Sequence, residues 1–137
     1  MKVVLDTNVL VSAILKPKSP PARILHLIIQ GDIELVVNQA IFTEYTEVLS
    51  RPKFQLEPKD IAPILDFIRE RAIRAPSLPQ SFHLPDEDDE PFLEACAAVG
   101  ADALLTGNKR HFPAEACKGQ SVLTPREFLE AIEDVMG

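Results

Sequence analysis

The chain has 137 residues, of which 46% are hydrophobic and 26% charged, as in an ordinary globular protein, and we expect one domain spanning residues 1–137. Its net charge of −7 argues against a protein that coats DNA non-specifically, because such proteins carry a basic surface, although acids gathered at one cation-binding site would also contribute to this imbalance. The sequence lacks an apolar segment of membrane-spanning length and an N-terminal signal-peptide pattern, so we expect no membrane partner and a cytoplasmic location.

Residues 1–12 contain the first predicted strand and the first candidate functional side chains. The short, β-branched apolar run before Asp6 is typical of a strand buried on both faces in a parallel sheet. In open α/β sheets the ligand crevice lies beyond the carboxyl ends of the strands, so Asp6 is a candidate catalytic or metal-binding carboxylate. The alternative is that Asp6, Thr7 and Asn8 cap a helix that begins at Val9.

The next elements are predicted from caps and apolar runs. Ser19 and Pro20 favour the start of a helix that continues to about Gln30, and Gly31 favours its end. Within this helix we interpret His26 as a buried or half-buried structural histidine rather than a ligand. Residues 34–37 form the second predicted strand, and Asn38 is the expected cap of the helix that follows.

Glu44 is the second candidate acid. The helix after Asn38 carries a core-facing stripe of apolar residues, and Glu44 lies about 60° from Ile41, at the edge of this stripe. Such an acid is most often a border residue. Because the helix directly follows a strand, however, its first turns lie near the carboxyl edge of the sheet, where Glu44 could face Asp6.

An amphipathic helix is predicted from about Pro58, with apolar positions at Ile61, Ile64, Leu65, Ile68 and Ala72. Its other face carries both acidic and basic residues: Asp66, Arg69, Glu70, Arg71 and Arg74. We interpret this face as solvated in preference to RNA-binding. Residues 75–85 are rich in proline and are expected to be extended.

Five consecutive acids, residues 86–90, precede the next predicted helix. Pro91 is tolerated only in a first helical turn, so this helix begins near Asp88 or Asp89 and ends at Gly100. The acids favour a helix N-terminus through their charge, and a solvated loop is the alternative. Asp89 nevertheless falls on the apolar face with Phe92. It is therefore the third candidate acid, and Asp86 and Asp88 are neighbours that could assist it.

Residues 103–106 form another strand, and Asn108 follows it as Asp6 follows the first strand. The alternative for Gly107-Asn108 is a simple turn. A short strand at residues 121–123 and a capping box at Thr124 and Glu127 complete the pattern, with a last helix beyond. Strands that alternate with helices predict an α/β fold, a three-layer α/β/α sandwich with a mostly parallel central sheet.

Four segments occur in an order known from one protein family. They are Val-Leu-Asp6-Thr-Asn-Val, Glu44 in Thr-Glu-Tyr-Thr-Glu-Val-Leu-Ser-Arg-Pro-Lys-Phe, Asp89 eleven residues before Gly100, and Leu-Leu-Thr-Gly-Asn108. With them the chain resembles the PIN-domain nucleases, in particular the short single-domain proteins regarded as toxins of bacterial or archaeal toxin–antitoxin pairs. The likeness covers essentially the whole chain.

The resemblance implies roles for individual residues. Asp6, Glu44 and Asp89 would be the first three members of an acidic quartet that binds Mg²⁺ or Mn²⁺. Asn108 would stand in place of the fourth, an aspartate in many members; asparagine keeps an oxygen ligand but loses a charge, which puts the number of bound ions in doubt. The groups expected to orient the carboxylates are Thr7, Asn8 and Thr106. The basic loop residues expected to contact flanking phosphates, unless they are merely solvated, are Arg51, Lys53, Lys109 and Arg110.

The resemblance therefore predicts a metal-dependent endoribonuclease that hydrolyses RNA phosphodiester bonds, with a cognate antitoxin and a homodimeric state. Neither His83 nor His111 has an evident acid or base partner in the sequence. Two alternatives stay open at this point. One is a catalytically weakened RNA- or protein-binding module of the same fold. The other is a metal-dependent phosphohydrolase of small molecules, which is disfavoured because Asp6-Thr7-Asn8 lacks a second aspartate.

Overall fold

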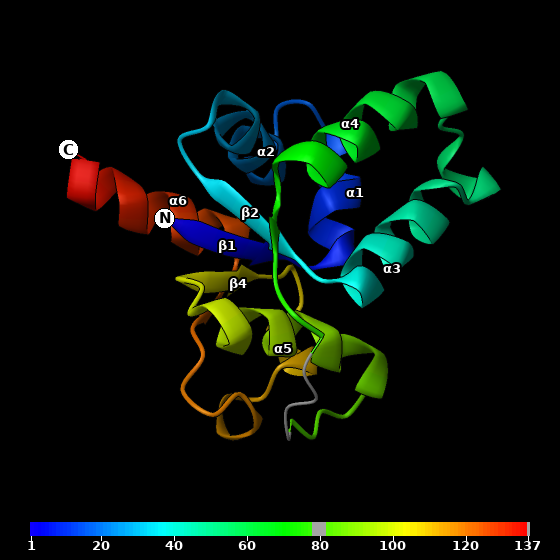
Figure 1. Cartoon of the computed structure of the whole chain (residues 1–137). Coiled ribbons are helices and arrows are strands. Elements are labelled where there is room, and N and C mark those ends of the chain that lie inside the picture. Colours follow the sequence, from blue (N-terminus) through cyan, green and yellow to red (C-terminus); the bar gives the residue numbers. More distant parts are fainter. Residues whose placement is uncertain (78–81, 137) are drawn as a thin grey trace.

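The computed structural model describes residues 1–77 and 82–136, and its centre is one parallel sheet of five strands (Figure 1). The strands are β1 (Lys2–Leu5), β2 (Glu34–Val37), β3 (Ile73–Arg74), β4 (Ala103–Leu105) and β5 (Val122–Leu123), and their spatial order is β3-β2-β1-β4-β5. Every strand pair is parallel. This confirms the predicted α/β class and the parallel sheet.

The strand order places β1 at the centre of the sheet. Val3 is paired with Leu35 of β2 on one side and with Ala103 of β4 on the other. The chain turns from β1 towards β2 and β3, and later returns to β4 on the opposite side, so the strand order reverses between β1 and β4. In open α/β sheets such a reversal opens a crevice at the carboxyl ends of the two strands. Asp6 and Thr106 lie at these ends.

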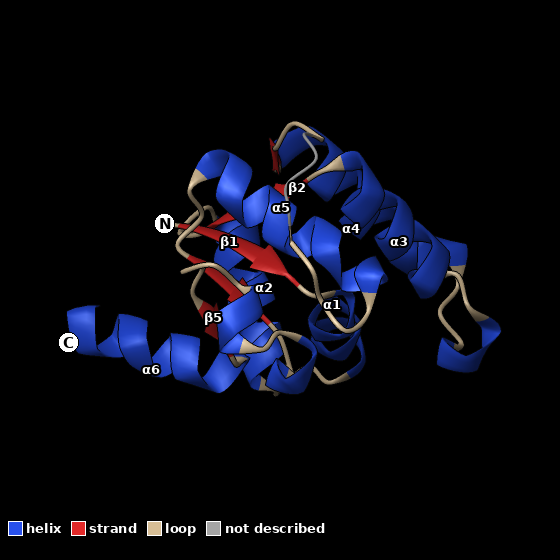
Figure 2. Ribbon diagram, turned by 90° about the horizontal axis from the view of Figure 1, so that it is seen from below, coloured by secondary structure: helices blue, strands red, loops and turns tan. Residues whose placement is uncertain are grey.

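Helices cover both faces of the sheet and produce three layers. They are α1 (Thr7–Leu15), α2 (Pro20–Gln30), α3 (Gln39–Leu49), α4 (Pro58–Arg71), α5 (Glu90–Val99) and α6 (Pro125–Met136). Helix α5 packs against β1, β2 and β4, whereas α1, α2 and α4 lie on the other side of the sheet (Figure 1). Figure 2 views the molecule from the side of α5. Except for Lys2 and Glu34, which are the first residues of β1 and β2, the strands β1, β2 and β4 are buried between these layers, which explains their apolar sequences.

The predicted caps are present. The Ser19 side chain accepts a hydrogen bond from the Ala22 amide, and Asn38 accepts one from the Ile41 amide at 2.9 Å. The capping box is complete, since the Thr124 amide donates to Glu127 and the Glu127 amide donates to Thr124. These local signals fix where α2, α3 and α6 begin.

Three expectations need correction. Helix α1 begins at Thr7, two residues before the expected start at Val9, because the Asp6 carbonyl already accepts the Val9 and Leu10 amides. His26 is exposed, since the buried stripe of α2 consists of Ile24, Leu25 and Ile28. The strand β3 was not predicted, and of the expected extended segment, residues 78–81 lie outside the described residues.

In the part of the chain that the structure describes, no helix has the length and hydrophobicity needed to cross a membrane.

Candidate active site

Asp6 lies at the N-terminus of α1, but its side chain does not cap that helix. The residue is only 6% exposed, and its Oδ2 accepts a hydrogen bond of 2.8 Å from the Thr106 hydroxyl at the end of β4. The Asp6 amide donates to the Leu105 carbonyl at 2.9 Å. Burial raises the pKa of the Asp6 carboxyl, while the Thr106 hydrogen bond opposes this rise. These contacts therefore fix the Asp6 carboxylate at the carboxyl ends of β1 and β4.

Glu44 lies near Asp6 because Thr7 connects them. The Thr7 hydroxyl, on the residue directly after Asp6, donates a hydrogen bond to Glu44 Oε2. Glu44 is half-buried on α3, in agreement with its predicted place at the edge of the apolar stripe, while Glu47 is exposed. Burial raises the pKa of the Glu44 carboxyl, and the negative charges of Asp6 and Asp88 raise it further. Glu44 and Asp6 thus share one electrostatic environment.

Asp89 is the third acid in this region. It immediately precedes α5, its side chain is 14% exposed, and its Oδ2 is buried without a hydrogen-bond partner. Burial and then the charge of Asp6 raise the pKa of the Asp89 carboxyl from 3.8 to about 6, although His111 opposes the change. The charges of Asp86 and Glu44 contribute to the rise. A buried carboxylate oxygen that lacks a donor is costly, so this atom is well placed for a cation.

Asn108 and His111 contact each other, and His111 lies near Asp89. Asn108 Oδ1 accepts the Arg110 amide at 3.2 Å, so its Nδ2 is the atom that meets His111 Nε2, also at 3.2 Å. The other ring nitrogen of His111, Nδ1, is 3.4 Å from Asp89 Oδ2. The expectation that His111 has no acidic partner is therefore wrong. The sequence gave no sign of this pair because Asp89 and His111 belong to different segments, before α5 and after β4.

The other predicted residues differ in how closely they approach these acids. Thr106 and Thr7 bind the acids directly, whereas Asn8 is exposed. Asp86 and Asp88 are exposed and form a local turn, in which the Asp88 amide donates to Asp86 Oδ1 at 2.9 Å.

The predicted basic residues have partners of their own. Arg51 pairs with Glu47 at 3.0 Å and Lys109 with Glu127 at 3.2 Å. The Lys53 ammonium lies 5.0 Å from the Phe54 ring centroid, and Arg110 is exposed. No hydrogen bond or ion pair among the described residues connects these four side chains to Asp6, Glu44 or Asp89.

The chemistry of the acids fits a divalent cation, although their arrangement is not that of a closed metal centre. Within residues 1–77 and 82–136, no group of three or more acidic, histidine or cysteine side chains forms a compact metal-binding cluster. Yet the charge of Asp6 raises the pKa of both Glu44 and Asp89, the charge of Glu44 adds to the rise at Asp89, and one buried oxygen of Asp89 has no hydrogen-bond partner. A cation would remove this repulsion, and oxygen ligands suit Mg²⁺ and Mn²⁺.

Comparisons with known proteins agree with the architecture. A family model described as PIN domain matches residues 2–110. Among solved structures, VapBC2 from Rickettsia felis, bound to a DNA fragment from its promoter, matches with a TM-score of 0.58 and 17% identity over 90% of this chain and 97% of that chain. FitAB bound to the IR36 DNA fragment matches with a TM-score of 0.61 and 18% identity, covering 90% of this chain and 94% of that chain.

A third solved structure, FitAcB from Neisseria gonorrhoeae, matches with a TM-score of 0.57 and 16% identity over 90% of this chain and 98% of that chain. The search of curated proteins returned no match. At these identities the solved structures support the fold, whereas the family model covers most of the sequence. The chain belongs to the PIN domain family.

Proposed function

We propose that the protein is a divalent-metal-dependent endoribonuclease. The observation that supports this proposal is electrostatic: Asp6, which follows the central strand where the strand order reverses, raises the pKa of Glu44 and of Asp89, and these acids belong to three separate segments. A buried Asp6 whose charge raises the pKa of both Glu44 and Asp89 is an unfavourable arrangement for stability alone. Nucleases of this fold family need such acids to hold cations beside a phosphate.

Each residue has a specific part in this proposal. Asp6, Glu44 and Asp89 would hold Mg²⁺ or Mn²⁺, and a bound ion would supply positive charge that activates water and stabilises the charge developing on the phosphate. Thr106 and Thr7 fix the orientation of the Asp6 and Glu44 carboxylates through their hydroxyl groups. These threonines keep the oxygen atoms in place before the substrate arrives, which lowers the cost of organising the site.

His111 positions Asp89. Its Nδ1 lies 3.4 Å from Asp89 Oδ2, and Asn108 Nδ2 contacts the other ring nitrogen, Nε2, at 3.2 Å. Asn108 itself uses its carbonyl oxygen for the Arg110 amide, so in this arrangement it does not offer that oxygen to an ion. The site would then depend on three carboxylates rather than four oxygen-bearing side chains.

The proposed partners follow from the family. We propose a cognate antitoxin, which the two-component complexes VapBC2 and FitAB support, together with a homodimeric state and action on cytoplasmic RNA. Co-purification with the product of a neighbouring gene and light scattering of the isolated chain would test the first two proposals.

The decisive experiment compares three purified proteins on a mixed RNA pool with Mg²⁺, Mn²⁺ or EDTA. They are the wild type, Asp6→Asn, and the control Asp32→Asn, whose side chain is exposed away from these acids. We expect wild type and control to cut RNA only with a divalent ion, and Asp6→Asn to lose at least a hundredfold in rate, or about 2.7 kcal/mol in transition-state stabilisation. Cutting that persists in EDTA or in Asp6→Asn would overturn the proposal.

A non-catalytic RNA-binding module is the second candidate. The absence of a compact metal cluster among the described residues, together with the commitment of Asn108 to the backbone, favours it. The same experiment separates the two functions, because a module would bind the RNA pool in every variant and would cut it in none.

A further inference from the structure

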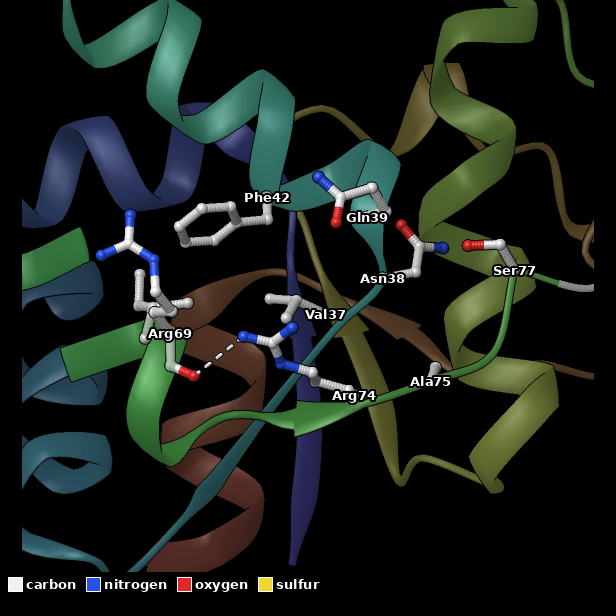
Figure 3. A pocket seen from close by; sticks show the side chains of 9 residues that line it. Val37, Asn38, Gln39, Phe42, Arg69, Arg74, Ala75 and Ser77 are labelled. Carbon is white, nitrogen blue, oxygen red and sulfur yellow. Dashed lines mark hydrogen bonds between the residues drawn. The ribbon is translucent and has the colours of Figure 1, made fainter. Parts of the chain in front are cut away.

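A pocket of about 410 Å³ lies at the carboxyl ends of β2 and β3 (Figure 3). Residues at the carboxyl ends of β2 and β3 form its floor, and the first turn of α3 and the last turn of α4 form its walls. Its volume is in the usual range for a small-ligand site. Side chains with polar or aromatic groups line it: Asn38, Gln39, Phe42, Arg69, Arg74 and Ser77.

Two arginines make this pocket locally basic in an acidic protein. Arg74 Nη2 donates to the Arg69 carbonyl at 3.1 Å, which fixes its guanidinium at the pocket (Figure 3). Among the described residues, no carboxylate forms an ion pair with Arg74, whereas Arg69 pairs with Asp66 at 2.8 Å. The pocket therefore carries a net positive charge. The N-terminus of α3, which begins at Gln39 on the pocket wall, adds to this potential.

An aromatic ring lies beside these charges. The Phe42 ring is half-buried, and the Arg69 guanidinium carbon is 5.3 Å from its centroid. A flat guanidinium next to an aromatic ring offers stacking surfaces, and single-stranded nucleic acids bind through such surfaces together with cations for their phosphates. The forked geometry of arginine also suits the oxygen atoms of a phosphate.

The position of the pocket connects it to the acids. Arg74 is paired with Val37 of β2, and β2 lies beside β1, whose carboxyl end carries Asp6. Strand β3, which carries Arg74, is therefore two strands away from β1, which precedes Asp6, and each step between neighbouring strands is about 4.8 Å. Both side chains are at carboxyl ends of parallel strands, so one extended ligand lying along this edge can reach both.

We propose that this pocket binds a phosphate and its nucleotide in the RNA strand next to the bond that is cut. The proposal rests on the proposed function, because it assigns the path of that same substrate. Arg74 and Arg69 contact the phosphate, and Phe42 with Arg69 packs against the base. Because the chain as a whole is acidic, RNA binding depends on the local positive charge of this pocket and not on a general basic surface.

The test measures binding separately from cleavage. A fluorescently labelled single-stranded RNA oligonucleotide is titrated, in Ca²⁺-free buffer with EDTA, into Asp6→Asn protein carrying Arg74→Ala, Arg69→Ala or Arg71→Ala. Arg71 is the matched control. It is on helix α4, as Arg69 is, but it lines a different pocket together with Glu34, the first residue of β2. All three arginines are exposed, so folding is expected to persist, and thermal unfolding of each variant checks this.

We expect Arg74→Ala to weaken RNA binding about tenfold and to reduce the slope of log K against log salt by about 0.7. Arg69→Ala should act in the same direction, and Arg71→Ala should change the Kd less than twofold. Equal losses in Arg74→Ala and Arg71→Ala, or no loss in either, would overturn the proposal. Displacement by polyglutamate as effectively as by unlabelled RNA would also overturn it, in favour of an acidic peptide ligand.

Failure of this inference and failure of the proposed function give different results. Arg74-dependent binding in a wild-type protein that never cuts RNA would refute the nuclease but would still show that the pocket binds RNA. Metal-dependent cutting with unchanged KM and Kd in Arg74→Ala would refute the pocket assignment alone.

Discussion

Replacing Asp89 with asparagine should stabilise the protein in the absence of metal. Asparagine has nearly the same shape but cannot ionise, and it can direct its oxygen towards His111 Nδ1. The native pKa of the Asp89 carboxyl is about 6 instead of the ordinary 3.8, so its ionised form is disfavoured in the folded state. Such a shift corresponds to about 3 kcal/mol, which we reduce to about 2 kcal/mol because the side chain keeps some contact with solvent.

The sign of the pH dependence follows from proton binding. Between pH 4 and pH 6 the folded state keeps a proton on Asp89 that the unfolded chain has released, so the wild-type free energy of unfolding falls as pH rises through this window. Above pH 6 the full penalty is present. The advantage of Asp89→Asn should therefore be largest at pH 7.5, about half as large at pH 5, and absent well below pH 4.

Thermal unfolding in EDTA measures this effect. At pH 7.5 we expect Asp89→Asn to raise the Tm by roughly 8 °C and at pH 5 by roughly half as much, while the exposed control Asp32→Asn stays within about 2 °C of wild type. A Tm gain that is equal at both pH values would contradict the electrostatic cause. A lower Tm in Asp89→Asn at pH 7.5 would show that the ionised Asp89 carboxylate makes a contact that stabilises the folded state.

Four further predictions test the site and the fold. Mg²⁺ or Mn²⁺ should raise the Tm of wild type but not of Asp6→Asn in a thermal shift assay, because binding to the folded state alone shifts the unfolding equilibrium. Thr106→Val should cost about 1–3 kcal/mol in urea unfolding, since it removes the donor to buried Asp6 Oδ2. Asn38→Ala should cost about 1–2 kcal/mol by removing the α3 cap and the bond to the Pro91 carbonyl, whereas Asn38→Asp should retain most of the cap. Leu104→Ala, in the fully buried β4, should cost about 2–5 kcal/mol, against less than about 1 kcal/mol for the exposed Leu15→Ala.

The sequence predicts the parts of the fold that depend on local patterns. The apolar strands and the caps at Ser19, Asn38 and Thr124 act over a few residues, and the structure confirms them. Helical periodicity also placed Glu44 at the edge of a buried stripe and Asp89 on the inner side of α5. Both acids could be found in this way because helical periodicity distinguishes the inward side of a helix from the side that is exposed to solvent.

Features that depend on the order of the strands could not be predicted in this way. Strand β3 has only two residues and is a strand because it pairs with Val36 and Val37 of β2. Its own sequence contains no pattern that predicts a strand. The same applies to Arg74, which the sequence places on a solvated face and the structure places in a pocket. His26 shows the opposite error, since apolar neighbours along the chain do not bury a residue that faces outwards.

Asn108 shows why the identity of a residue in a motif is weaker evidence than its hydrogen bonds. From the sequence, its amide oxygen is a candidate ligand at the end of β4, as Asp6 is at the end of β1. In the structure that oxygen accepts the Arg110 amide, and the amide nitrogen meets His111, which in turn faces Asp89. The electrostatic balance of the acids therefore depends on a histidine, and loss of the Asn108 side chain should act through the orientation of His111. Asn108→Ala and His111→Ala should consequently change metal affinity by similar amounts, and a double variant should add little to either. Additive losses in isothermal titration with Mn²⁺ would instead show that Asn108 binds the ion itself.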